Sequence, residues 1–254
     1  MNPQKGGTDG PARTPSHVTS DEMIDHYSIT ASAKQVSERF SVDVPDFYQA
    51  HYNASPTQSL PVITSSAPEG LSTFYWGTAP GWAKNKNVSE KLVNIRAEDF
   101  PERPSLIRTL RSHRGIVPAD GFYGWKKVGK KTTIPYRFVF KTQSLLSFAA
   151  LWEEFEDTDG NQIQTFAIIT TPADSVVSPI QERMPVILNL QTEKIWLDRN
   201  ADEEQLTRII SSADTAEMNY YPVSPRISQK DIDVPSLIIP TPPSDQFGNL
   251  TLFD

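Results

Sequence analysis

Cysteine and histidine, which commonly serve as nucleophile, base or metal ligand, are absent and few, respectively, in this sequence. Its 254 residues contain no cysteine, and the only histidines are His17, His26, His51 and His113, none in a close pair. The missing cysteine excludes disulfides, thiolate metal sites and a thiol nucleophile within this chain. The scattered histidines disfavour a histidine-rich metal site. We therefore expect neither a metal nor a cofactor.

Asn94 and Arg96 have polar side chains that could bind one ligand together. They flank Ile95, so on an extended stretch they share one face. In that arrangement they could hold a phosphate and the neighbouring sugar oxygen. The alternative is a buried arginine that ties a carboxylate such as Glu98 into the core.

Two tryptophans bracket a Gly-Thr-Ala-Pro loop, and both are DNA-binding candidates. Aromatic rings beside basic residues can stack on unpaired bases, at about 1–3 kcal/mol per base. The alternative is that both anchor the core. We expect Trp76, in a strand, to favour the core, whereas Trp82 lies beside Lys84 and Lys86 and is the better DNA candidate.

The formal charge of −7 disfavours nucleic acid, but it is unevenly distributed. Between Lys84 and Lys141 fourteen Lys and Arg face five Asp and Glu. Such a segment can form a phosphate-binding face, although charge alone slightly favours a solvated surface hairpin at 126–131. Arg183 is the best phosphate candidate outside this segment, and its alternative is a salt bridge with Glu182 or another acid.

The spacing of apolar residues predicts an α+β fold: a single domain of antiparallel strands with peripheral helices. We expect a disordered tail at 1–22, a domain at 23–240 and a C-terminal tail at 241–254. The predicted helices are 31–40, 192–198, 202–210 and most of 88–114, interrupted by Pro101 and Pro104. The predicted strands are 56–64 after an initial turn, 71–76 after a Pro-Glu-Gly turn, 115–125, 134–141, 145–152, 164–171 and 184–188. No apolar run is long enough for a membrane span or a secretory signal, so we expect a cytoplasmic protein.

Five segments occur in an order that resembles a known family. They are YWGTAPGWAKN (75–85), NIRAED (94–99), RGIVPADGFYGWKK (114–127), TTPADSVVSPIQERMPVIL (170–188) and YPVSPRIS (221–228). Together they resemble the SOS response-associated peptidase (SRAP, abasic-site processing) family over residues 23 to about 240. VPADGFYGW followed by ERMPVIL is the most specific part of this resemblance.

The resemblance implies a DNA damage function. Family members use a cysteine directly after the initiator methionine, and its thiol and amine capture the aldehyde of an abasic site in single-stranded DNA as a thiazolidine. A glutamate and a histidine assist proton transfer, while an asparagine and an arginine hold the DNA and the site. The resemblance also implies a monomer that associates with the nucleoid when bound to DNA.

The reactive positions of the family carry unreactive residues here. The nucleophile position falls on Ile24, the glutamate position on Gly124 and the histidine position on Gln181. A hydrocarbon, a hydrogen and an amide cannot replace a thiol, an acid and a base. By contrast, the family's positioning residues are matched by Pro56, Trp76, Trp82, Asn94, Arg96 and Arg183. His26 stands where the family has an arginine and could keep a weaker form of its contact, but we expect it to be a surface histidine.

Three functional hypotheses remain open on these residues. The first is a pseudoenzyme that binds single-stranded or junction DNA, abasic or intact, without the cysteine-mediated cross-link. The second is an enzyme that captures the abasic aldehyde as a Schiff base, through a lysine or the terminal amine. The third is a scaffold that binds a protein or small molecule in a neutral cleft.

Overall fold

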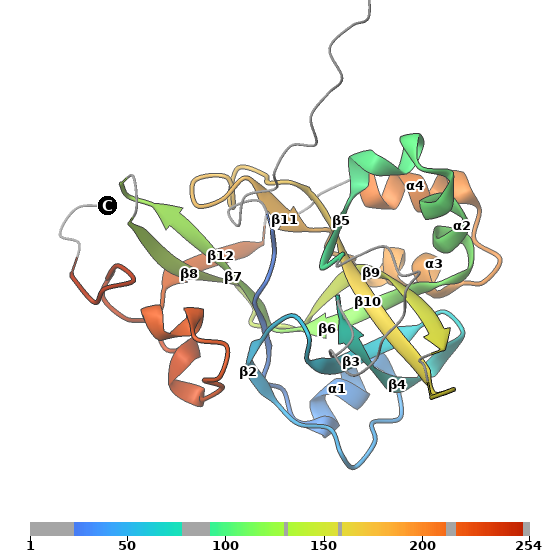
Figure 1. The fold of residues 1–254 in the computed structure, drawn as a ribbon, viewed down its shortest axis with the longest axis horizontal. Coiled ribbons are helices and arrows are strands. Elements are labelled where there is room, and N and C mark those ends of the chain that lie inside the picture. Colours follow the sequence, from blue (N-terminus) through green and yellow to red (C-terminus); the bar gives the residue numbers. More distant parts are fainter. Residues whose placement is uncertain (1–22, 78–91, 130–131, 157–158, 212–216, 251–254) are drawn as a thin grey trace, which may run out of the picture.

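The computed structural model describes residues 23–77, 92–129, 132–156, 159–211 and 217–250. The expected tail at 1–22 lies outside these stretches, as do Trp82, Lys84 and Lys86. The described residues build two sheets with helices around them (Figure 1). The predicted α+β architecture of antiparallel strands and peripheral helices is confirmed.

Five strands of the larger sheet close into a ring. They follow the order β10-β4-β3-β6-β9, and β9 pairs again with β10. β10 is buried along most of its length because its residues 165–171 are uncharged and mostly apolar. The pairing of β10 with β4 is parallel, and the other contacts around the ring are antiparallel. The ring strands are β3 (Ser59–Thr64), β4 (Ala67–Trp76), β6 (Arg114–Ala119), β9 (Leu146–Glu156) and β10 (Gln162–Pro172).

Two short strands extend β10 beyond the ring and carry candidate residues. β5 (Asn94–Arg96) runs parallel to β10, and β11 (Arg183–Pro185) runs antiparallel to it. The helix expected over most of 88–114 is therefore wrong at 94–96. That segment is a strand because β10, some seventy residues later, supplies its hydrogen-bonding partner. Figure 1 shows β5 and β11 near each other at the upper edge of the view.

The second sheet is antiparallel and has the order β12-β8-β7-β1-β2. Phe122 of β7 and Phe138 of β8 are direct partners, and their rings stack with centroids 4.7 Å apart. This pairing fixes the register of the segment that carries Gly124. The strands are β1 (Tyr27–Ile29), β2 (His51–Ala54), β7 (Gly121–Lys127), β8 (Thr133–Phe140) and β12 (Met218–Pro222).

The helices begin at recognisable capping residues. Ser32 and Gln35 form a capping box at the start of α1, and Asn189 caps α3. α2 starts at Pro104, where a missing N–H is tolerated. In Figure 1, α2, α3 and α4 lie together, away from α1. The helices are α1 (Ala33–Phe40), η2 (Ala97–Glu102), α2 (Pro104–Ser112), α3 (Leu190–Leu197), α4 (Glu203–Ser211), η3 (Pro225–Ser228) and η4 (Pro235–Ile238).

Arg114 is buried at the joint between helices α2 and α3. It is 1% exposed and donates to the carbonyl oxygens of Leu110 and Arg111 near the end of α2, and of Trp196 and Asp198 at the end of α3. Burial lowers the pKa of its guanidinium. This arginine satisfies carbonyls that the helix ends leave without partners, so it contributes no charge to a DNA-binding surface.

Two other sequence expectations concern the turn before β4 and the C-terminal boundary. The prediction of a turn at Pro-Glu-Gly is wrong, because residues 68–70 lie within β4. At the C-terminal end, Gln246 Oε1 accepts a hydrogen bond from the Thr133 backbone N–H at 2.9 Å. The described part of the segment 241–250 therefore contacts β8, while the domain boundary at 240 stays a prediction. No helix among the described residues is long and apolar enough to cross a membrane.

Candidate functional site

Asn94 holds the segment that precedes β1. Its side-chain oxygen accepts from the Ile24 backbone N–H at 2.7 Å, and its amide donates to the Ile24 carbonyl at 2.9 Å. The Ile24 side chain is fully buried in the core. These reciprocal hydrogen bonds fix the backbone at position 24, where the resemblance places the nucleophile.

Gly124 and Gln181 occupy one space between β7 and the segment before β11. A Cβ atom at position 124 would lie 2.7 Å from Cδ of Gln181 and closer still to its Oε1. Gln181 is held there, because its amide donates to the Arg183 carbonyl at 2.7 Å. The neutral amide thus fills the volume that a side chain at position 124 would need.

Arg183 forms a bidentate ion pair with Glu98. Its guanidinium lies 2.9–3.0 Å from the two carboxylate oxygens and also donates to the hydroxyl and carbonyl of Thr170. Burial raises the pKa of Glu98, but the hydrogen bonds from Arg183 and the charges of Arg183 and Arg96 outweigh it and lower the pKa. Arg183 is 8% exposed, so its alternative interpretation, an internal salt bridge, describes this structure; a DNA contact by Arg183 stays a prediction.

Arg96 lines a cavity of about 290 Å³, which we call the Arg96 cavity and which has Met23 in its wall. Arg103 lies across from Asp99, with a nitrogen–oxygen distance of 3.4 Å. Two guanidiniums beside amide and hydroxyl groups are suited to a phosphate. The polar residues that line the Arg96 cavity are Asn94, Arg96, Asp99, Arg103 and Thr170.

A second cavity of about 240 Å³, the His26 cavity, also includes Met23 in its wall. The expectation of a surface histidine is wrong, because His26 is only 3% exposed and its ring packs edge-on against Trp125 with centroids 5.1 Å apart. Its Nδ1 lies 2.9 Å from the Asp25 carboxylate, and its buried Nε2 has no hydrogen-bond partner among the described residues. Other lining residues are Thr133, Gln181, Ser228 and Lys230.

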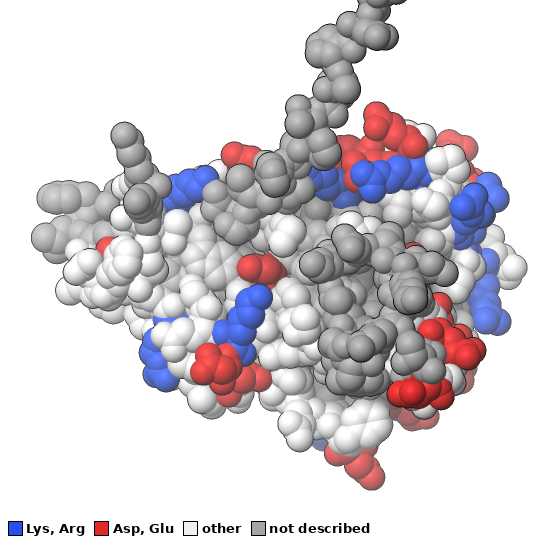
Figure 2. Space-filling model, in the orientation of Figure 1, with Lys and Arg blue, Asp and Glu red and all other residues white. Residues whose placement is uncertain are grey.

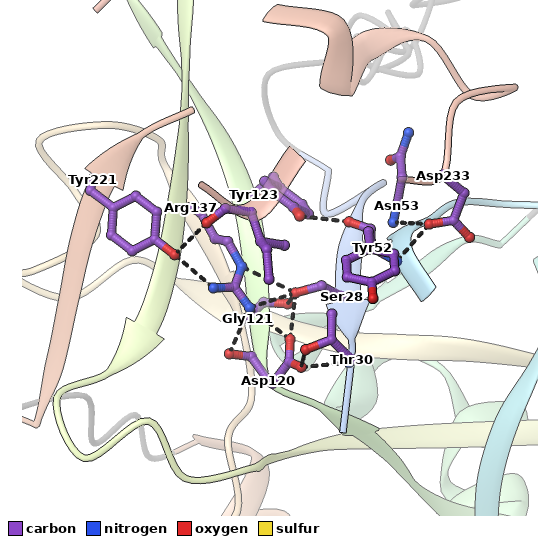
Figure 3. A network of polar contacts seen from close by, with 11 residues as sticks. Ser28, Thr30, Tyr52, Asn53, Asp120, Gly121, Tyr123, Arg137, Tyr221 and Asp233 are labelled. Carbon is purple, nitrogen blue, oxygen red and sulfur yellow. Dashed lines mark hydrogen bonds and ion pairs between the residues drawn. The ribbon is translucent and has the colours of Figure 1, made fainter. Parts of the chain in front are cut away.

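A buried polar network links β1, which follows His26, to Asp120 before β7 and to Arg137 of β8 in the same sheet (Figure 3). Asp120 accepts from the hydroxyls of Ser28 and Thr30 and forms an ion pair with Arg137 at 2.7 Å. Burial lowers the pKa of Arg137, but Asp120 and the nearby phenols raise it by more, and the net shift is upward. Arg137 is therefore, like Arg114, an arginine of the basic segment that is buried and bonded to internal partners.

A second anchor holds the loop that carries Ser228 and Lys230. The buried Asn53 amide is within hydrogen-bond distance of the carbonyls of Ile227, Gln229 and Ile232. Asp233 accepts from the backbone N–H groups of Tyr52 and Asn53, as Figure 3 shows. The part of the His26 cavity wall that Ser228 and Lys230 form is thereby attached to β2.

The remaining aromatic and proline candidates occupy different environments. Trp76 is fully buried, stacks on Phe166 and donates to the Val93 carbonyl at 2.9 Å. Trp76 is therefore a core residue, as the alternative interpretation expected. It cannot stack on a DNA base, because neither face of its ring is free. Pro56 is half-buried in the turn between β2 and β3, and a DNA contact there stays a prediction.

Charged side chains of both signs are mixed on the face that Figure 2 shows. Among the described residues, Lys and Arg on this face alternate with Asp and Glu rather than forming one basic patch. Within the described stretches, no group of three or more His, Asp and Glu has the arrangement of a metal site.

Sequence reasoning missed two cationic residues of the site, Arg103 and Lys230. Arg103 stands between an interrupted helical segment and Pro104, and its position beside Arg96 depends on the path of β5. Lys230 is about a hundred residues away from Trp125 in sequence but lines the same cavity. The only sequence signal was for Lys230, which follows the YPVSPRIS motif by two positions.

The described residues form an α+β domain in which Asn94 holds the backbone of Ile24 and Gln181 fills the space beside Gly124. The family model described as SOS response associated peptidase (SRAP) matches residues 23–230. This chain belongs to the SRAP family.

Named relatives and a solved structure agree with this assignment. The abasic site processing protein YoqW of Bacillus subtilis is 35% identical over 221 residues, covering 85% of this chain and 99% of YoqW. The abasic site processing protein HMCES of Rattus norvegicus is 27% identical over 237 residues, covering 77% of this chain and 66% of HMCES. A crystal structure of a Bacteroides thetaiotaomicron protein superposes with a TM-score of 0.75 at 26% identity, covering 85% of this chain and 99% of that one.

Proposed function

We propose that this chain is a DNA-binding pseudoenzyme of the SRAP family. It binds single-stranded DNA or junctions between single and double strands and does not form the cysteine-mediated cross-link. The names of its relatives, which are abasic site processing proteins, support a role related to abasic DNA. The observation that carries the proposal is the pair of hydrogen bonds between Asn94 and Ile24, which keeps the site assembled around an unreactive side chain.

The loss of chemistry follows from the side chains at the three reactive positions. Ile24 has no heteroatom, Gly124 has no side chain, and the Gln181 amide neither donates nor accepts protons in acid–base catalysis. A thiazolidine requires a sulfur atom, and the 254 residues contain no cysteine.

DNA binding is supported by the Arg96 cavity. Arg96 and Arg103 line it together with the Asn94 amide, so a phosphate there would meet two guanidiniums. The buried arginines Arg114, Arg137 and Arg183 do not contribute, because their donors are used by internal partners. We therefore expect a small number of phosphate contacts and a moderate salt dependence.

A fluorescence anisotropy titration with labelled single-stranded and gapped DNA tests the proposal. We expect binding in the micromolar range or tighter that weakens moderately as salt increases, as a small number of phosphate contacts requires. Arg96→Ala should weaken binding roughly tenfold and reduce the salt slope by about one. Lys34→Ala is the control, because Lys34 lies on α1 and lines neither cavity. Absence of binding at low salt, or equal effects of the two variants, would contradict the proposal.

A further inference from the structure

The chain enters the domain through the wall of the Arg96 cavity. Met23 is half-buried and lines that cavity. The next residue, Ile24, has both its backbone N–H and its carbonyl fixed by Asn94. The side chains that precede Met23 therefore start from a fixed point at the edge of this cavity.

The two residues that precede Met23 are both acidic. They are Asp21 and Glu22, whereas the third acid of the segment 1–22, Asp9, is much farther along the chain. Consecutive Cα atoms are about 3.8 Å apart, so the Cα atom of Glu22 lies about 4 Å from that of Met23, and that of Asp21 at most about 7 Å. The connectivity of the chain thus brings two carboxylates within reach of the cavity.

The charge of the Arg96 cavity is suited to carboxylates. Its described charged lining residues are two arginines, Arg96 and Arg103, and one acid, Asp99. The neighbouring acid Glu98 forms its ion pair with Arg183, so this pair leaves the balance unchanged. One carboxylate cannot neutralise two guanidiniums, and the lining therefore has an excess of positive charge.

The His26 cavity is a poorer site for the same carboxylates. It also has Met23 in its wall, but its described lining contains one lysine, Lys230, and one acid, Asp25, whose charges cancel. An acid that precedes Met23 therefore gains more electrostatic free energy beside the two arginines than in the His26 cavity.

We propose that Asp21 and Glu22 occupy the Arg96 cavity as a built-in competitor of the DNA phosphate. This inference rests on the proposed function, since it makes the N-terminal segment a regulator of the same site. Carboxylate and phosphate oxygens are both anionic acceptors for guanidinium N–H groups, so the two cannot use Arg96 and Arg103 at once. Because the acids belong to the same chain, they compete at a high effective concentration. The apparent affinity for DNA is reduced according to the fraction of molecules in which they occupy the cavity.

Neutralising the two acids tests the competition. The Asp21→Asn/Glu22→Gln variant keeps the shape of both side chains and removes their charge. It should bind labelled single-stranded DNA about fivefold more tightly than the unmodified chain in anisotropy titrations, since an exposed ion pair contributes about a two- to fivefold preference. Asp9→Asn/Glu38→Gln is the matched control, because it makes the same two exchanges and Glu38 is an exposed residue of α1 that lines neither cavity. It should change the affinity by less than about twofold.

The Arg96→Ala background separates a contact in the cavity from a general effect of charge. In this background the gain from Asp21→Asn/Glu22→Gln should fall from about fivefold to about twofold or less, because one of the two partners of the acids is gone. An equal gain in both backgrounds, an equal gain from the control, or no gain in the unmodified background would overturn the inference.

A measurement without DNA keeps this inference apart from the proposed function. The NMR signals of the Arg96 and Arg103 Nε–Hε groups report directly on ion pairs at these side chains. They should shift in Asp21→Asn/Glu22→Gln and stay in place in the control. Unchanged signals overturn the inference even if DNA binds. Shifted signals without DNA binding by any of these proteins support the contact but overturn the proposed function and, with it, the competition.

Discussion

Substitutions at Gly124 and Gln181 should have strongly coupled effects on the free energy of unfolding. Gly124→Ala should destabilise the unmodified chain but stabilise the Gln181→Ala variant. In the unmodified chain, Gly124→Ala places a Cβ 2.7 Å from Cδ of Gln181. The amide must then move and give up its hydrogen bond to Arg183, a loss of about 0.5–1.5 kcal/mol. Replacing glycine by alanine in a compatible strand contributes about 0.4–1 kcal/mol in the opposite direction. With some residual overpacking against Phe138, we expect a net destabilisation of about 1 kcal/mol.

In the Gln181→Ala background the same substitution should stabilise the fold by about 0.5 kcal/mol, because the clashing amide is gone and the Phe138 ring, 3.0 Å from the new Cβ, can shift into the space that it leaves. The coupling free energy from a double-mutant cycle is then about 1.5 kcal/mol, within the usual range for contacting residues. Urea unfolding of the four proteins measures it, and thermal midpoints should move by roughly 2–4 °C per kcal/mol.

Gly70→Ala provides the matched control for this cycle. Gly70 also lies in a strand, but a Cβ there would meet no atom within 4 Å. Its substitution should be additive with Gln181→Ala to within about 0.5 kcal/mol. Additive behaviour of Gly124→Ala as well would refute the conclusion that Gln181 fills the missing side-chain volume.

Three other substitutions test the surrounding structure. Arg114→Met should lower the free energy of unfolding by more than about 2 kcal/mol in urea titrations, because buried carbonyls at two helix ends lose their donor; a neutral result would contradict this role. Glu98→Gln should lower stability near neutral pH but not at strongly acidic pH. The lowered pKa of Glu98 means that its contribution is present above the unfolded value of about 4.3 and is lost as pH falls through the folded value; a pH-independent difference would argue against the ion pair with Arg183. Asn94→Ala should accelerate amide hydrogen exchange at Ile24 by roughly tenfold, whereas unchanged exchange would show that Asn94 does not hold this backbone.

The sequence predicts the long strands well, because the pattern of apolar residues that indicates each strand lies within the strand itself. Strands such as β8 and β10 have nearly the expected bounds, since most of their residues are apolar, aromatic or β-branched. Short strands behave differently. β1, β2 and β5 have three or four residues each, and they are strands only because distant partners supply hydrogen bonds.

Individual site residues were harder to predict than the fold. Arginine in a basic segment suggests a DNA contact, yet Arg114 donates to helix-end carbonyls and Arg137 pairs with Asp120. Burial of a charged group depends on partners far away in sequence, which composition does not report. The same holds for His26 and Lys230, whose shared cavity forms only when β1 meets the loop after η3.

A covalent cross-linking gel with abasic single-stranded DNA, run without a reductant, tests most directly whether the site is intact but unreactive. It compares the unmodified chain with a variant that starts at Met23 and carries Ile24→Cys, Gly124→Glu and Gln181→His. The Gln181→His exchange removes the amide that blocks position 124, and Asn94 is placed to hold the backbone nitrogen at position 24. We predict no heat-stable adduct for the unmodified chain and a heat-stable adduct for the variant. A heat-stable adduct with the unmodified chain, or none with a folded variant that binds DNA, would contradict the account.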